Sequence, residues 1–141
     1  MGRPSGTVRG ARHVGRTIAG TAVLAVLTAG VWWLWLGSDT TYQPDPVTGA
    51  SSGPYEAPQI AACVLCLALL CVGGTMLLPP ALVAITVTAA FTVTWSIRAS
   101  AEDSSGLWAV GAALLGFGTA VGTGLAVTAT WALRSRLRRR R

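Results

Sequence analysis

The longest stretch of the chain without a charged side chain covers residues 57–97. Pro79 and Pro80 divide it into two apolar runs, residues 60–78 and 81–97. A helix needs about 20 apolar residues to cross a hydrocarbon core about 30 Å thick, and each run comes close to that length. The stretch therefore predicts two membrane-spanning helices joined by a tight turn at the proline pair.

Two further apolar runs flank this pair, residues 18–36 and 107–133. The first run follows a basic segment, as in a secretory signal peptide, but it ends on Trp32, Trp33 and Trp35. A signal peptide has an apolar core of about 7–15 residues and closes on small residues that the peptidase recognises. We therefore expect an uncleaved anchor, and four spans in all.

Composition agrees with the membrane class. Of the 141 residues, 52% are apolar and only 11% are charged, which is unusual for a soluble globular domain. The length is that of one domain. All eleven basic residues are arginine, and lysine and asparagine are absent. Such a composition is typical of a GC-rich bacterial gene.

Arginines mark the expected orientation. The tails, residues 1–17 and 134–141, hold four and six arginines, whereas the long loop at residues 37–59 holds none and carries three carboxylates. Arginine-rich segments stay in the cytoplasm. We therefore expect an all-α protein of the bacterial plasma membrane, with four helices in an up-down bundle and both termini cytoplasmic. The turns at residues 79–80 and 98–106 then lie inside and outside, respectively.

Tryptophans near the ends of the runs predict anchors at the headgroup level. Trp108 and Trp131 are 23 residues apart, about 35 Å of helix at 1.5 Å per residue, which fits two opposite interfaces. The expected anchors are Trp32, Trp33, Trp35, Trp95, Trp108 and Trp131.

The long loop permits two interpretations. Four of its side chains are suited to an extracytoplasmic partner, namely Tyr42, Asp45, Tyr55 and Glu56. The alternative is a passive connector. Turn-forming residues 47–49 and 51–54 allow a short hairpin, although the prolines remove donors from any ladder. Calcium needs six to eight oxygen ligands at a spacing that this loop does not show.

Small residues recur every fourth position in the fourth run, so they share helix faces. One row is Ala112, Gly116, Ala120, Gly124 and Thr128; the other is Gly118, Gly122, Ala126 and Thr130. Small residues let a neighbouring helix come close. The rows predict packing inside the bundle or, alternatively, a homodimer seam or a docking face for another membrane protein.

No span contains Asp, Glu, Lys, Arg or His. An ionisable residue inside a membrane usually marks a proton relay or a substrate path. Its absence weighs against a pump, a proton-coupled transporter and haem ligation by histidine. We expect neither a cofactor nor a metal.

Cys63, Cys66 and Cys71 all lie in the second run. Cys63 and Cys66 are three residues apart and share a helix face, so their sulfur atoms could form a disulfide. Cysteine also behaves as a small apolar residue, and apolar surroundings lower its reactivity. Packing and redox chemistry are thus both open.

The layout with Cys63-Val-Leu-Cys66 at the outer start of the second span resembles the bacterial quinone-reducing, disulfide-forming membrane oxidases of the DsbB type. The resemblance implies thiol–disulfide exchange with a bound quinone. That family carries a second cysteine pair between its third and fourth spans, whereas residues 98–106 hold none. It also carries an arginine shortly after the first pair, whereas residues 67–70 are apolar.

The chain as a whole resembles small four-span membrane proteins of actinobacteria, through Asp45-Pro-Val-Thr-Gly49 and Gly53-Pro-Tyr-Glu-Ala57 before the second span. We expect a non-enzymatic accessory protein. The alternatives are a thiol–disulfide oxidoreductase using Cys63 and Cys66, and an oligomeric transport component.

Expected partners are another membrane protein or a second copy, and anionic lipids of the inner leaflet rather than nucleic acid. The arginines expected to contact those lipids are Arg134, Arg136, Arg138, Arg139, Arg140 and Arg141.

Overall fold

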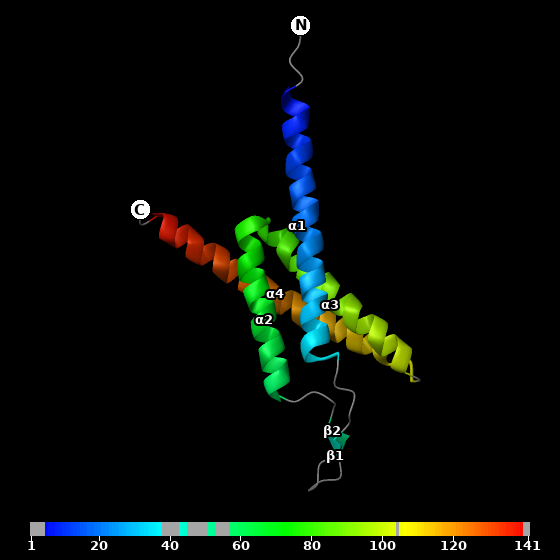
Figure 1. Ribbon diagram of the computed structural model, residues 1–141. Helices are drawn as coiled ribbons and strands as arrows, with labels where there is room; N and C mark the ends of the chain where they lie inside the picture. The colour runs from blue at the N-terminus through cyan, green and yellow to red at the C-terminus, as the bar shows by residue number, and fades with distance from the viewer. Residues whose placement is uncertain (1–4, 38–42, 45–50, 53–56, 104, 140–141) are drawn as a thin grey trace.

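The computed structural model describes residues 5–37, 43–44, 51–52, 57–103 and 105–139 (Figure 1). Their elements, in chain order, are α1 (Ser5–Trp35), β1 (Gln43–Pro44), β2 (Ser51–Ser52), α2 (Ala57–Leu77), α3 (Pro80–Glu102) and α4 (Trp108–Arg139). Each of the four helices is long and apolar enough to cross a membrane. The expected all-helical class with four helices of spanning length is confirmed.

All four helices are longer than the apolar runs that predicted them, and α2 begins three residues before its run. Residues 5–17 and 134–139, expected as tails, belong to α1 and α4, and α3 continues through Arg98 to Glu102. Hydropathy marks where a helix can lie in hydrocarbon, and it does not mark where the helix ends. Arginine is a good helix former, and no proline interrupts these extensions of α1, α3 and α4, so the backbone continues into them.

The turn between α2 and α3 consists of Leu78 and Pro79. Pro79 has φ −57° and ψ 136°, an extended conformation that ends the helical path, and Pro80 opens α3. Proline is well tolerated in the first turn of a helix, because its missing N–H would have no partner there. The expected turn at the proline pair therefore has a direct structural cause.

Pro79 also removes the backbone donor that a carbonyl near the end of α2 would otherwise have. The carbonyl of Thr75 would accept a bond from the residue four positions later, but proline has no N–H to donate. Arg134 of α4 supplies the donor instead, because its Nη1 lies 2.9 Å from the Thr75 carbonyl oxygen. One arginine thus caps α2 and fixes the last turns of α4 against the α2–α3 turn.

Replacing Arg134 with alanine is expected to lower the free energy of unfolding by about 1.5 kcal/mol, the low end for a hydrogen bond to a charged group. Pro79→Ala supplies a backbone N–H that can take over the Thr75 carbonyl. The loss on Arg134→Ala should therefore shrink in the Pro79→Ala background, as measured by a double-mutant cycle of unfolding in mixed micelles. An equal loss in both backgrounds would mean that Arg134 acts in another way.

The helices pack around α2 and α3. α2 and α3 each contact all three other helices, whereas the backbones of α1 and α4 do not come close to each other within the described residues. Figure 1 shows α3 and α4 running together obliquely, while α1 and α2 are closer to upright. α1 and α4 therefore lie on different sides of the α2–α3 pair.

The packed interior lies where α1, α2 and α3 meet. Val83 and Val87 of α3 are fully buried there, beside Leu24 of α1 and Cys71 of α2, and Val127 of α4 completes the cluster. A second cluster surrounds Trp32 with Cys63 and Phe91. These two clusters hold the fold together.

Large apolar side chains also cover the outside of the helices. Leu27, Leu65, Ile85 and Leu125 are exposed by half or more, one from each helix, and Phe117 is 73% exposed. A soluble monomer rarely exposes apolar surface on this scale. Such an exterior suits contact with lipid.

Buried polar groups are few and mostly paired locally. Thr28 is fully buried and its hydroxyl donates to the Leu24 carbonyl at 2.8 Å. Thr88 and Thr123 join α3 to α4 through their hydroxyl oxygens, 3.0 Å apart. Threonine hydroxyls satisfied in this way can be accommodated in hydrocarbon.

Asp103 organises the connection between α3 and α4. Its Oδ1 accepts hydrogen bonds from the Ser105 hydroxyl at 2.5 Å and the Ser105 N–H at 2.7 Å, and its Oδ2 accepts one from the Trp108 N–H at 2.7 Å. The carboxylate therefore caps the first turn of α4. These donors, the Ser105 hydroxyl first, lower the pKa of Asp103 below its ordinary value of 3.8.

A depressed pKa makes the stabilisation by Asp103 dependent on pH. The contribution should be complete above the ordinary pKa of the unfolded chain and should disappear as the pH falls through the lower, folded pKa. Asp103→Asn should therefore unfold at a lower temperature than the parent at pH 6, and this difference should begin to shrink only as the pH falls below the ordinary value of 3.8. Thermal unfolding at a series of pH values from pH 6 into the acid range below 3.8 tests this; a difference that shrinks already well above pH 3.8, or that does not change with pH at all, would contradict it.

β1 and β2 form a short antiparallel pair, with Gln43 opposite Ser52 and Pro44 opposite Ser51. The sequence left a hairpin in this loop open, and the structure contains one. Tyr42, Asp45, Tyr55 and Glu56 lie outside the described residues, as do Arg140 and Arg141.

Candidate functional site: an apolar groove between α2 and α4

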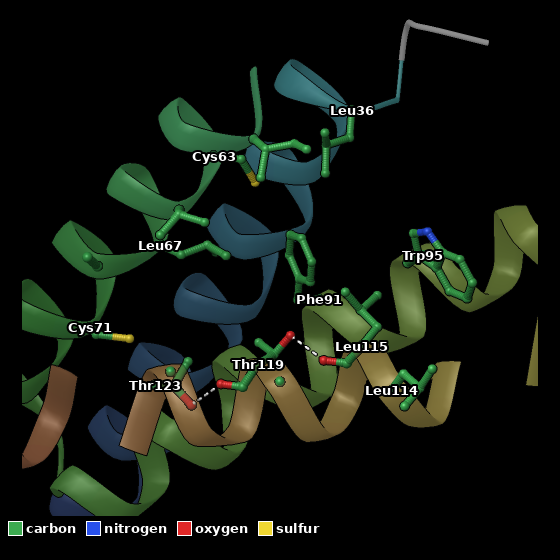
Figure 2. Close-up of a pocket in the computed structure, with 15 residues that line it drawn as sticks. Leu36, Cys63, Leu67, Cys71, Phe91, Trp95, Leu114, Leu115, Thr119 and Thr123 are labelled. Carbon is green, nitrogen blue, oxygen red and sulfur yellow. Dashed lines mark hydrogen bonds between the residues drawn. The ribbon is translucent and has the colours of Figure 1, made fainter. Parts of the chain in front are cut away.

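A groove with a volume of about 470 Å³ lies between α2 and α4, above a floor provided by α3 (Figure 2). Its volume falls within the range of roughly 300–1,000 Å³ that is usual for ligand sites. The groove is therefore a candidate functional site.

The α2 wall follows from residue spacing. Six α2 residues line the groove at intervals of three or four positions, so they occupy one face of the helix. They are Ile60, Cys63, Val64, Leu67, Ala68 and Cys71. Figure 2 shows Cys63 and Leu67 on one side of the groove and Thr119 and Thr123 of α4 on the other.

The floor comes from two aromatic side chains of α3, Phe91 and Trp95. Phe91 is buried and Trp95 is half-buried. Gly111 of α4 allows this arrangement, because a Cβ there would lie 2.7 Å from Cη2 of the Trp95 ring. From the sequence Trp95 is expected at the membrane interface and Phe91 has no assigned role; the i,i+4 spacing of the two residues was the available signal for a shared face.

The α4 wall is built on glycine. Gly118 and Gly122 are exposed and line the groove, and a Cβ added to either would meet no atom within 4 Å. Leu114 and Leu115 line one end of the groove, together with Leu36, which follows α1. This part of α4 therefore presents an uncovered backbone to whatever occupies the groove.

The two rows of small residues have different surroundings. A Cβ on Gly116 would lie 3.4 Å from Thr92 of α3, so Gly116 packs inside the fold. Ala112 is half-buried, whereas Ala120 is exposed, and a Cβ on Gly124 would meet nothing within 4 Å. Packing inside the bundle therefore explains the glycine at position 116. The space beside Gly118 and Gly122 is not filled by any other part of the described chain.

Polar atoms in the groove have little free hydrogen-bonding capacity. The Thr119 hydroxyl donates to the Leu115 carbonyl at 2.7 Å, and the Thr123 hydroxyl donates to the Thr119 carbonyl at 2.8 Å. No charged side chain lines the groove. An occupant therefore has to be apolar.

The three cysteines are free thiols with different positions. Cys63 and Cys71 are buried and line the groove, whereas Cys66 is half-buried and is not part of the wall. Cys63 and Cys71 are eight residues apart, about 12 Å along the helix, which is beyond the Cα separation of a disulfide. Of the Cys63–Cys66 pair, only Cys63 therefore lines the groove.

The six tryptophans separate into two groups. Trp33, Trp108 and Trp131 are exposed by 55%, 38% and 61%, so their rings are available to a membrane interface. Trp32 is only 1% exposed and belongs to the packed interior, while Trp35 and Trp95 are half-buried. Trp32 therefore packs against protein rather than lipid.

Among the residues that the structure describes, no three His, Cys, Asp or Glu side chains lie together so as to hold a metal ion. Comparison of the chain with protein-family models, with curated proteins and with solved structures finds no match.

Proposed function

We propose that this chain is a four-span, non-enzymatic accessory protein of the bacterial plasma membrane, and that the groove between α2 and α4 receives an apolar helix of a partner. The observation that carries the proposal is the exposure of Gly118 and Gly122 in the groove wall, where a Cβ would meet nothing. Exposed glycines four residues apart permit the close backbone approach on which helix association in membranes depends.

The proposed orientation is an up-down bundle with both termini in the cytoplasm. Arg134 contacts the Thr75 carbonyl, and a Cβ on Gly20 would lie 3.1 Å from Leu78, so α4 and α1 each bring a basic segment toward the α2–α3 turn. The described acidic residues, Glu102 and Asp103, lie at the α3–α4 connection instead. Arginine-rich ends retained in the cytoplasm account for this asymmetry.

The test is substitution of the groove glycines by leucine. Gly118→Leu together with Gly122→Leu should fill the groove and reduce association at least tenfold. Energy transfer between labelled copies in liposomes measures self-association, and co-purification from the native membrane measures association with another protein. The matched control is Gly30→Leu on α1, an exposed glycine whose Cβ would also meet nothing within 4 Å.

Loss of association in both variants would indicate a general effect of leucine on the lipid-facing surface. Unchanged association in the groove variant would contradict the proposal. Helical content should be the same in all variants, because a Cβ at each of these positions meets no atom within 4 Å and leucine is a good helix former.

A further inference from the structure

The last turns of α4 carry four arginines in six residues, Arg134, Arg136, Arg138 and Arg139. Arg136, Arg138 and Arg139 are exposed, and none of them has an ion pair or hydrogen bond among the described residues. The described carboxylates, Glu102 and Asp103, lie at the α3–α4 connection. The arginine cluster therefore lacks a counter-charge in the described part of the chain.

Arg134 differs from the other three. Its Nη1 is held against the Thr75 carbonyl, which fixes this guanidinium beside the α2–α3 turn. A guanidinium has five N–H donors, so several remain for an anion. Arg138 follows one turn later on the same face of α4, since residues four apart lie one above the other. The two side chains thus share the side of α4 that meets the turn.

Apolar side chains adjoin the cluster. Leu133 and Leu137 lie one turn apart among the arginines of α4, and their side chains are 60% and 57% exposed. Leu77, beside the α2–α3 turn, is 87% exposed. Charge alone would suit any phosphate compound, including a nucleic acid. Exposed leucines beside unpaired arginines suit a molecule with an anionic head and apolar chains.

We propose that the arginines of α4 and the adjoining α2–α3 turn form a binding site for the headgroup of an anionic phospholipid, with its acyl chains against Leu77, Leu133 and Leu137. Arg134 positions the site by capping α2, and Arg138, on the same face of α4, supplies free donors to the phosphate. Arg136 and Arg139 project from other faces of α4 and add positive charge around the site. Arginine binds phosphate through paired N–H donors, which makes this recognition stronger than that of a point charge. The site is separate from the groove and does not depend on it.

The experiment measures lipid retention by the full chain in detergent, using native mass spectrometry. The probes are phosphatidylglycerol and phosphatidylcholine with identical acyl chains. The test variant combines R136Q, R138Q and R139Q and keeps Arg134, so that the α2 cap is preserved. Membrane attraction corresponds to roughly a fivefold effect per arginine, so phosphatidylglycerol retention should fall more than tenfold, while phosphatidylcholine retention stays the same.

Two controls separate this site from net charge. R98Q removes an arginine from α3, where Arg98 pairs with Glu102 at 2.5 Å, and should leave retention unchanged. R12Q with R16Q removes two exposed arginines of α1, whose backbone does not come close to that of α4, and should have a much smaller effect. An equal loss in either control would overturn the proposal.

Further outcomes identify another ligand. Displacement of phosphatidylglycerol by millimolar inorganic phosphate would show that the apolar chains contribute nothing, and it would overturn the lipid assignment. Binding of a short RNA with the same arginine dependence, in place of lipid, would do the same. Gly118→Leu should leave lipid retention unchanged, so failure of the groove proposal and failure of this one are distinguishable.

Discussion

Replacing Gly74 with leucine is expected to lower the free energy of unfolding by about 3 kcal/mol, because the site has no room for a side chain. A Cβ at Gly74 would lie 3.1 Å and 3.3 Å from the two γ-carbons of Val83, and 3.5 Å from Cδ2 of Leu24. Val83 is fully buried and cannot move aside. The added atoms would have to push α2 away from α1 and α3.

The neighbouring glycine provides a matched control. Gly73 is exposed, and a Cβ there would meet nothing within 4 Å. Gly73→Leu should leave stability unchanged or raise it slightly, because glycine is a poor helix former. Reversible unfolding in mixed micelles titrated with dodecyl sulfate compares the two variants. Similar losses at both positions would mean that α2 does not pack as described.

Replacing Trp32 with alanine is expected to cost about 3 kcal/mol, the lower end of the range for truncating a buried tryptophan. The lower end applies because lipid is as apolar as the side chain, so the loss consists mainly of packing contacts. Trp32 is 1% exposed and packs with Cys63 and Phe91. Its removal would leave a hole where α1, α2 and α3 meet.

Replacing Trp32 with phenylalanine separates two effects on stability, the packing of the aromatic ring and the burial of the indole N–H. The Nε1 of Trp32 is buried and has no hydrogen-bond partner among the described residues. Trp32→Phe removes that donor and keeps an aromatic ring, so it should cost less than about 1.5 kcal/mol. The same unfolding titration measures both variants. A larger loss for phenylalanine than for alanine would contradict this account of the site.

The sequence predicted much of the fold, because hydropathy and proline act locally. Residues 57–97 without a charge, and the proline pair within them, were enough to predict α2, α3 and the turn between them. Helix ends were less predictable, since a helix does not have to end where its apolar stretch ends. For that reason α1 begins at Ser5 and α4 extends to Arg139.

The candidate site was harder to predict, because it depends on which helix faces meet. Spacing placed Gly116 and Gly118 in two rows of small residues, but only the packed structure shows that Gly116 meets Thr92 while Gly118 meets nothing. Trp32 illustrates the same limit. A tryptophan at the end of an apolar run suits an interface, and only the position of α2 and α3 explains why this one is buried.

The separation of the α1 and α4 backbones bears on the biogenesis of the protein. Most residues of the larger core cluster come from the first three helices and the α2–α3 turn, so they can pack together before α4 has been synthesised. These residues are Leu24, Cys71, Leu78, Val83 and Val87. α4 would then dock onto a preformed three-helix unit. On this order of insertion the groove is completed last, so the partner helix proposed above would enter it only after the rest of the core is in place.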